Sequence, residues 1–306
     1  SKVSRFPTPC GSCSKRLKWD AMETTPAFHI LLTNDDGHAA PGIRAMRSVL
    51  LSEGYRVSLV APSQEQSATS MSTTTRRNMP LEPLAEGGWH LDAQPADTVL
   101  VALRHLLQDD PPDLVVSGVN FGPNLGVGLH ASGTIGAAVI AALNGYPAIA
   151  VSAGMLFQEA LESPPHFPST HQVLEPAARF TCRVIESLRN GSATNDRLLP
   201  AGVLLNVNYP PLPKDAIKGV LFPEVSGGHL IELGYQRCEQ TGHVVPRYHR
   251  NVDPDHPERE AGDVRAHLEG YITVSPVKPS WNPPDEQSQL IQQRLNGLFD
   301  DKAWRG

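Results

Sequence analysis

The sequence has few cysteines and no long apolar run. Four cysteines in 306 residues are too few and too scattered for a disulfide framework, which favours a reducing, cytoplasmic compartment. No run approaches the roughly 18 consecutive apolar residues of a membrane span, and we find no charged-then-apolar signal peptide at the start. We therefore expect neither a membrane contact nor export.

Positive charge is also scarce once the first residues are set aside. The formal charge of the chain is −6, but residues 1–21 hold five Lys or Arg against one Asp and carry +4, which leaves −10 for the remainder. A body this acidic argues against a surface that coats a nucleic-acid polymer. With 40% hydrophobic residues the chain can still bury a large core, as one α/β domain or one domain with an appendage.

The first 27 residues lack an apolar period and are rich in Ser, Pro and Thr, so we predict a disordered tail. Met22 stands a few residues before the first expected strand and suits a native start. We interpret the preceding segment as a vector remnant, with a targeting peptide as the alternative. A single folded domain is then expected over residues 28–306.

Residues 28–37, FHILLTNDDG, hold the most informative pattern. Their apolar run predicts a buried parallel strand, and the adjacent carboxylates of Asp35 and Asp36 must lie just past its end. Ligands bind at the carboxyl ends of strands in an open parallel sheet. Because adjacent carboxylates repel, a hard divalent cation is the natural means of neutralising them. The alternative is a solvated turn before a helix, the commonest use of Asp-Asp-Gly.

A strand–helix–strand unit is expected next. Apolar residues recur at helical spacing between Pro41, which suits a first helical turn, and Gly54, which suits a helix end. Residues 56–60 predict the second strand, and such a unit is typical of a doubly wound sheet. The polar loop that follows contains Ser67, whose hydroxyl can serve a metal or a phosphate or can satisfy only the loop backbone.

A glycine-rich loop in residues 117–133 then runs into a helix. Amides at a helix N-terminus form an anion site, to which the hydroxyls of Ser132 and Thr134 add donors. No Lys-Ser/Thr follows the glycines and the dinucleotide fingerprint is absent, which excludes a Walker loop and a Rossmann dinucleotide site. The alternatives are Ser132 as a plain N-cap, and Asn120 and Asn124 as turn residues.

The remaining periodic segments complete the predicted sheet, and the sequence from residue 214 is then more polar. We expect a helix capped by Asp97, strands at residues 113–116, 147–152 and 203–207 (the last core strand), an amphipathic helix at 173–188, a strand within 270–279 and a closing helix at 285–299. Apolar residues in 214–267 occur only in short alternating patches, which favours extended hairpins over helices. Seven of the twelve histidines lie between His166 and His267 without metal-ligand spacing, and we assign them to surface or loop positions.

In their order along the chain, these motifs closely resemble the SurE survival-protein family of metal-dependent nucleotidases. The resemblance covers about residues 30–276 and includes TNDDG followed by APGI, VAPSQEQSA, SGVNFGPNLG, SGTIGAA, PAIAVS, LLNVNYP and DVRAHLEGYITVSP. Several spaced motifs in the right order are far more specific than any one of them. Two positions depart from the family pattern: Ala68, where a glycine is usual after the serine, and Ala131, where an aromatic residue commonly precedes SGT.

The resemblance implies a Rossmann-like three-layer α/β/α sandwich with a carboxy-terminal β extension, about residues 214–276, exchanged in a homodimer or tetramer. It also implies hydrolysis of nucleoside 5′-monophosphates, and of 3′-monophosphates as a second class, with one Mg²⁺ or Mn²⁺ per subunit. Carried over by motif, the metal ligands are Asp35, Asp36, Ser67 and Asn120, all oxygen donors as these cations require. The phosphate or substrate contacts fall to Asn34, Asn124, Ser132, Gly133 and Thr134.

We expect the reaction to be hydrolysis by water, with Asp35 and Asp36 as the catalytic acids and the metal polarising a phosphoryl oxygen. An aspartyl-phosphate route through Asp35 is weaker, because a ligating carboxylate is a poorer nucleophile and the Asp-x-Asp pattern of that phosphatase superfamily is absent. A response-regulator receiver would be shorter and would have an acceptor Asp where this chain has Ser117. A non-catalytic nucleotide-binding stress protein is the remaining alternative, and the intact ligand set argues against it.

Overall fold

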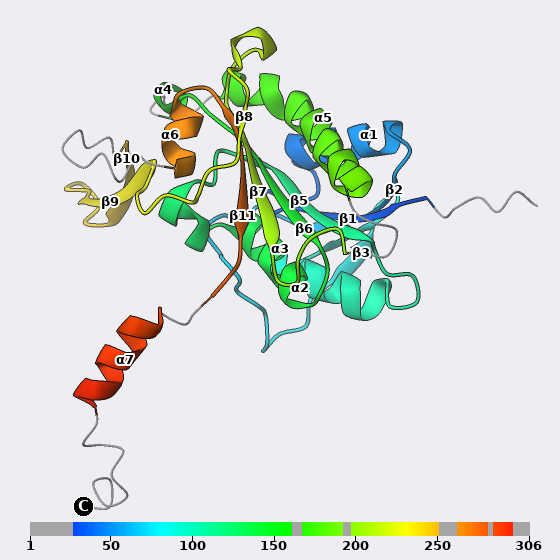
Figure 1. Cartoon of the computed structure of the whole chain (residues 1–306), viewed down its shortest axis with the longest axis horizontal. Coiled ribbons are helices and arrows are strands. Elements are labelled where there is room, and N and C mark those ends of the chain that lie inside the picture. The colour runs from blue at the N-terminus through cyan, green and yellow to red at the C-terminus, as the bar shows by residue number, and fades with distance from the viewer. Residues whose placement is uncertain (1–26, 161–166, 192–196, 251–261, 281–283, 296–306) are drawn as a thin grey trace, which may run out of the picture.

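The computed structural model describes residues 27–160, 167–191, 197–250, 262–280 and 284–295. Figure 1 shows a twisted sheet with helices on both faces, the three-layer α/β/α sandwich that the sequence predicted. The sheet has nine strands in the order β3-β4-β2-β1-β5-β6-β7-β11-β8. None of the described helices is long and apolar enough to span a membrane.

Parallel strands form the centre of the sheet: β1 (His29–Thr33), β2 (Arg56–Pro62), β5 (Leu114–Phe121), β6 (Ala148–Ala153) and β7 (Leu204–Tyr209). Short strands extend both edges: β3 (Leu81–Pro83), β4 (Trp89–Leu91), β8 (Val220–Leu221) and β11 (Ile272–Val277), of which β11 runs antiparallel to β7. The chain passes from β1 to β2 on one side and returns to β5 on the other. The strand order therefore reverses between β1 and β5, where doubly wound sheets bind their ligands.

Four helices cover the two faces: α1 (Pro41–Ser52) and α5 (Pro168–Gly191) on one, and α2 (Pro95–Val101) and α3 (Gly133–Leu143) on the other. One turn of π-helix, η1 (Ala102–Leu106), continues α2. The strand β1 shows why its apolar run is unbroken. Ile30 and Leu32 pack with the core of α1 and α5, whereas Leu31 packs with that of α2 and α3. A strand covered on both faces needs apolar side chains at every position.

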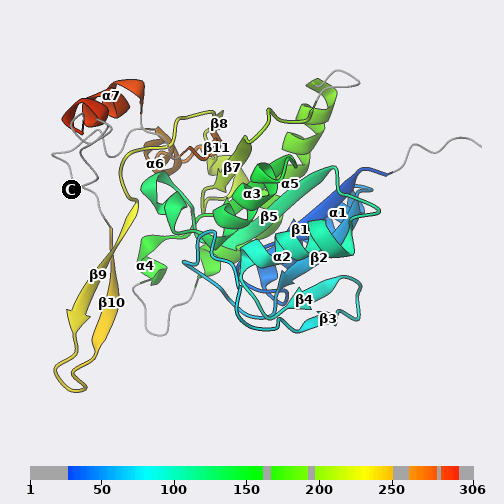
Figure 2. The same ribbon diagram turned by 90° about the horizontal axis from the view of Figure 1, so that it is seen from below.

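The remaining elements lie toward the C-terminus or in loops: η2 (Gly126–His130), α4 (Phe157–Ala160), η3 (Lys214–Ala216), β9 (Ile231–Arg237), β10 (Val244–Arg250), α6 (Gly262–Leu268) and α7 (Asp285–Arg294). Strands β9 and β10 form a separate antiparallel hairpin that projects from the body (Figure 2). The helix α7 lies apart from the sheet in Figure 1, and none of its residues is buried.

Several elements differ from the sequence-based predictions in the first two thirds of the chain. Asp97 is not the N-cap of α2: Gln94 holds that position, and Asp97 is the third helical residue of a capping box. Strand β5 runs on to Phe121, so Asn120 lies on a strand where a loop was predicted. The short strands β3 and β4 were missed, since three residues are too few to show a period.

The region expected to be an extended arm, residues 214–276, is only in part an arm. The hairpin of β9 and β10 fits that description, but α6 is a helix where none was predicted and β11 is a strand of the main sheet, so β7 is not the last core strand. His267 on α6 is buried rather than on the surface. The predicted tail, residues 1–27, lies outside the described residues except for Ala27, as does the end of the closing helix beyond Leu295.

Candidate active site

The loop after β1 turns sharply and places both acids at the reversal of the strand order. Gly37 closes the turn at a φ of +95°, and a Cβ there would lie 3.2 Å from the Gln64 carbonyl carbon. The Asn34 amide donates to the Gly37 oxygen at 2.9 Å, while Asn34 Oδ1 is buried and has no hydrogen-bond partner among the described residues. The turn therefore leaves one buried acceptor beside the acids.

Asp35 is 3% exposed and is enclosed by two segments. The Thr134 hydroxyl donates to Asp35 Oδ1, and a Cβ on Gly133 would lie only 2.8 Å from Asp35 Cβ. From the loop after β2, the Gln66 amide donates to the Asp35 backbone oxygen at 2.7 Å. Burial raises the pKa of Asp35, and the Thr134 hydrogen bond opposes that rise.

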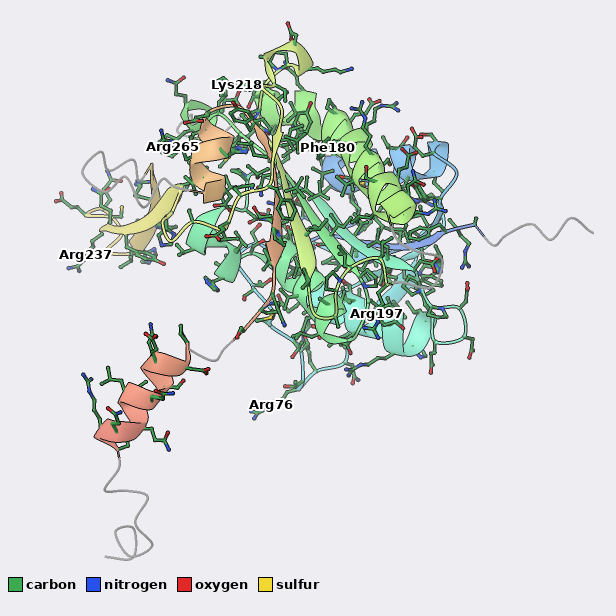
Figure 3. All side chains as sticks on the ribbon, viewed as in Figure 1. Arg76, Phe180, Arg197, Lys218, Arg237 and Arg265 are labelled. Atoms are coloured by element: carbon green, nitrogen blue, oxygen red, sulfur yellow. The ribbon has the colours of Figure 1, made fainter. Side chains whose placement is uncertain are left out.

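Asp36 faces β5. The Phe121 amide donates to Asp36 Oδ2 at 3.1 Å, which places this carboxylate beside Asn120. Burial raises the pKa of Asp36 to about 7, and the nearby charges of Asp35 and Glu65 add to the rise. No described Lys, Arg or His forms an ion pair with either acid. The labelled Arg76 and Arg237 lie far out on a loop and on the hairpin (Figure 3).

The loop after β2 brings Ser67 to the site, one residue beyond Gln66. Ser67 is exposed, and its hydroxyl donates to Glu65 Oε1 at 2.8 Å. Ala68 adopts a φ of +59°, a left-handed conformation that favours glycine. The glycine that the family resemblance led us to expect here would adopt this conformation without strain, whereas Ala68 adopts it at some cost.

Asn120 and Asn124 approach from the end of β5. Asn120 pairs in register with Ser152 of β6, and its amide donates to the Gly122 oxygen at 2.8 Å. The Asn124 amide donates to Ser152 Oγ at 2.9 Å. Two buried asparagines on β7 hold the Asn124 backbone: Asn208 Oδ1 accepts its N–H at 2.8 Å, and the amides of Asn206 and Asn208 donate to its oxygen. Hydrogen bonds therefore fix both the backbone and the side chain of Asn124, which is not a free turn residue.

The support of Asn124 by Ser152, Asn206 and Asn208 was not predicted. The available signal was the polar pattern of LLNVNYP, because two asparagines two residues apart within a buried strand point to the same face. Buried amides need partners, and a loop backbone at the strand end supplies them.

The start of α3 contributes Ser132, Gly133 and Thr134. Ser132 Oγ accepts the Ile135 amide at 3.1 Å and so caps the helix. Thr134 is fully buried, and its hydroxyl donates to Asp35 and does not face an open site. This hydrogen bond was not predicted from the sequence. The close approach of Gly133 to Asp35 leaves no room for a side chain.

The donor chemistry of these residues fits a hard divalent cation. Asp35 is buried and Asp36 is half-buried, and the pKa of each is raised. Asn34 Oδ1 is an acceptor without a partner among the described residues, and Ser67 and Asn120 lie on the two segments whose backbone contacts the acids. No three His, Cys, Asp or Glu side chains of the described chain cluster as metal ligands do. A cation here would therefore rely on hydroxyl and amide oxygens as well as the two carboxylates, as Mg²⁺ and Mn²⁺ sites do.

The chain is similar to known proteins. A model of the family described as Survival protein SurE matches residues 30–230. This chain belongs to the SurE family. A protein of Synechococcus sp. (strain JA-3-3Ab) named 5′-nucleotidase SurE is 32% identical over 264 residues, which cover 82% of this chain and 92% of that protein. The 5′-nucleotidase SurE of Carboxydothermus hydrogenoformans is 38% identical over 221 residues, covering 70% of this chain and 77% of the relative.

The SurE fold is confirmed by a solved structure. The crystal structure of the SurE protein from Aquifex aeolicus superposes with a TM-score of 0.70 at 28% identity, covering 88% of this chain and 99% of the other. The family pattern therefore extends beyond the motifs to the whole sandwich.

Proposed function

We propose that this SurE protein is a 5′-nucleotidase that hydrolyses nucleoside 5′- and 3′-monophosphates with the help of one Mg²⁺ or Mn²⁺ ion per subunit. The observation that carries the proposal is the pair Asp35 and Asp36, one buried and one half-buried, which lie at the reversal of the strand order without a cationic partner in the described chain. Such a pair is costly unless a ligand neutralises it. The names of the relatives support the reaction class.

Each acid has a defined support. Thr134 orients Asp35 through its hydroxyl, and the Phe121 amide orients Asp36, so both carboxylates are held before any ligand arrives. Asp35, Asp36, Ser67 and Asn120 would hold the cation. When bound, a divalent cation polarises a phosphoryl oxygen and lowers the pKa of a water. We assign Thr134 to the orientation of Asp35 in place of the direct phosphate contact expected from the sequence.

The phosphate is assigned to the space between the start of α3 and Asn124. Backbone amides at the α3 N-terminus offer donors and the positive end of the helix dipole. Ser132 keeps its own hydrogen available, because its oxygen serves only as acceptor in the cap. Asn124, with Ser152 fixing its amide, would bind an equatorial oxygen, and Asn34 would complete the contacts to the substrate.

Hydrolysis by water is favoured over an aspartyl-phosphate route. The Thr134 hydroxyl occupies Oδ1 of Asp35, and the other oxygen lies against Gly133, where a Cβ would be 3.0 Å from Oδ2. A carboxylate that is 3% exposed and already accepts a hydrogen bond at Oδ1 is poorly placed for in-line attack on phosphorus.

The test is a metal-by-substrate panel on chelator-treated protein, with nucleoside 5′- and 3′-monophosphates, sugar phosphates and a chromogenic phosphate ester. We expect no turnover in chelator and recovery with Mg²⁺ or Mn²⁺. Full turnover in chelator would contradict the metal dependence, and no turnover of any ester under any condition would leave only nucleotide binding.

We further propose a homodimer in which the hairpin of β9 and β10 is exchanged. Tyr235 and Val244 on this hairpin are 69% and 64% exposed, and no described residue of α7 is buried. Isolated two-stranded hairpins are marginally stable, so such an arm needs a partner. Shortening residues 232–249 to a Gly-Ser turn should give a monomer by light scattering; a persisting dimer would place the interface elsewhere.

A further inference from the structure

A small apolar pocket lies at the carboxyl ends of β6 and β7, on the same edge of the sheet as the acids. Its volume is about 210 Å³, and its walls include Pro123, Met155, Phe157, Pro211, Ile231 and His267. Pro123 directly precedes Asn124, and Met155 packs on the same loop, since a Cβ on Gly122 would lie 3.8 Å from its methyl carbon. The pocket and the proposed phosphate site therefore share one loop.

The separation of the two regions suits a nucleotide. The acids lie past β1, whereas the pocket lies past β6 and β7, the second and third strands from β1 in the sheet order. At a strand spacing of about 4.8 Å this is on the order of 10–14 Å, which is the scale of a nucleoside monophosphate from phosphate to base. Asn124 follows Pro123 of the pocket wall and is bonded to Ser152 on β6 and to Asn206 and Asn208 on β7.

The walls suit an apolar, uncharged ligand. Every described lining residue is apolar except His267, and none is Lys, Arg, Asp or Glu, so the pocket offers nothing to a phosphate. His267 Nδ1 is buried without a hydrogen-bond partner in the described chain. Its ring is pressed on Gly154, where a Cβ would lie 2.8 Å from Nε2. One polar group on an apolar, partly aromatic wall is the usual pattern of a small-molecule site.

We propose that this pocket receives the nucleobase of the substrate, with Phe157 and Met155 against the ring and His267 as the single polar side chain of the wall. The inference rests on the proposed nucleotidase function. It also assigns a role to the foot of the hairpin, because Leu230 and Ile231 close one side of the pocket. A larger cavity of about 850 Å³ lies along α3, but none of the proposed site residues lines it.

The experiment compares kcat/KM for AMP and for ribose 5-phosphate, which carries the same ester without a base. The variants are Phe157→Ala in this pocket and Phe222→Ala in the larger cavity, as a matched control. Wild type should prefer AMP, and Phe157→Ala should lower kcat/KM for AMP by about 10-fold or more, the range of a base–aromatic stack. Its kcat/KM for ribose 5-phosphate should not change. Phe222→Ala should alter neither substrate.

A titration of adenosine into the metal-free protein separates this proposal from the nucleotidase function. Saturable binding that Phe157→Ala weakens supports the pocket even if no ester is hydrolysed. Equal kcat/KM for AMP and ribose 5-phosphate in wild type, with no adenosine binding, would overturn the proposed base pocket. Hydrolysis of AMP in the same assay would still support the nucleotidase function. Loss of AMP preference in Phe222→Ala instead would move the base to the larger cavity and overturn the proposal.

Discussion

The carboxyl edge of the sheet has two halves of opposite character. Over β1 and β5 lie the buried Asp35 and the half-buried Asp36, two carboxylates without a described cationic partner. Over β6 and β7 lies an apolar pocket in which His267 is the single polar side chain among the described lining residues. The same burial acts on both, raising the pKa of the acids and lowering that of His267 to about 4. Burial therefore disfavours the ionised carboxylates in one half and the protonated imidazole in the other. A bound cation can stabilise only the carboxylates.

Under the proposed function, the two halves of this edge would take opposite ends of a nucleotide, the phosphate at the charged half and the base at the apolar half. A bound cation would relieve the repulsion between the two acids, so the charged half suits a ligand that binds together with a cation. The apolar half is stable with His267 neutral and offers no charge to a phosphate. Substitutions in one half should show whether the other half responds.

The largest effect is expected in the charged half, from Asp36→Asn. The substitution keeps the size and removes one negative charge, so metal affinity must fall, and the rate with Mn²⁺ should drop by about 10³-fold or more. Asp92→Asn, at an exposed carboxylate paired with Arg77, is the matched control and should leave the rate unchanged. A wild-type rate in Asp36→Asn would return the acids to a plain turn.

In the apolar half, stability should depend on pH through His267. An unfolded histidine takes up a proton near pH 6.5, whereas His267 in the native state does so only near 4. The stability that comes from burying the neutral ring is therefore fully present above pH 6.5 and is lost as the pH falls toward 4. The loss is roughly 3 kcal/mol. Urea unfolding at several pH values should show a shallower acid loss for His267→Phe; identical profiles would contradict the shift.

Thr134→Val tests the support of Asp35 at the border of the charged half. The variant keeps the shape and removes the hydroxyl that donates to Asp35. A hydrogen bond to a charged group is worth about 1.5–3 kcal/mol, so kcat/KM should fall by roughly 10- to 150-fold. Thr181→Val removes a buried hydroxyl that donates to the Ala177 oxygen in α5 and should not change the rate. Equal behaviour of the two variants would reduce Thr134 to a packing residue.

The smallest effect concerns Ala68 in the loop that carries Ser67. Its φ of +59° is strained for alanine, and Ala68→Gly should raise the free energy of unfolding by up to about 1 kcal/mol. The matched control, Ala45→Gly within α1, should lower it by about 1 kcal/mol. Thermal melts distinguish the two, and a lower melting temperature for Ala68→Gly would mean that the loop does not need this conformation.

Much of the site was predictable because its signals are local. The apolar run ending in Asp35 and Asp36 fixed a strand end, and the glycines before α3 fixed a helix start, so both segments lie where the pattern placed them. Nothing local shows that the Thr134 hydroxyl turns toward Asp35, or that Asn206 and Asn208 support Asn124, because these contacts join residues 82 to 99 positions apart.

The C-terminal region was less predictable for a related reason. Residues 262–268 form α6 although their polar texture suggested a hairpin, since tertiary contacts fix the helix: the buried carboxylate of Asp263 accepts the amides of Ser226 and Gly126. Strand β11 joins the main sheet beside β7, a pairing between distant segments. Pattern alone cannot separate a strand of the core from a strand of an arm.

Whether Asp35 and Asp36 bind a cation can be measured by calorimetric titration of Mn²⁺ into chelator-treated wild type and Asp36→Asn, with thermal melts alongside. We expect one ion per subunit in wild type and affinity weakened at least 10- to 100-fold in the variant, about the loss that even an outer-shell change causes. Without metal, Asp36→Asn should be at least as stable as wild type, because the repulsion between the acids is gone, and it should gain less from Mn²⁺. Wild-type Mn²⁺ affinity in Asp36→Asn, or no binding to wild type, would contradict the metal site.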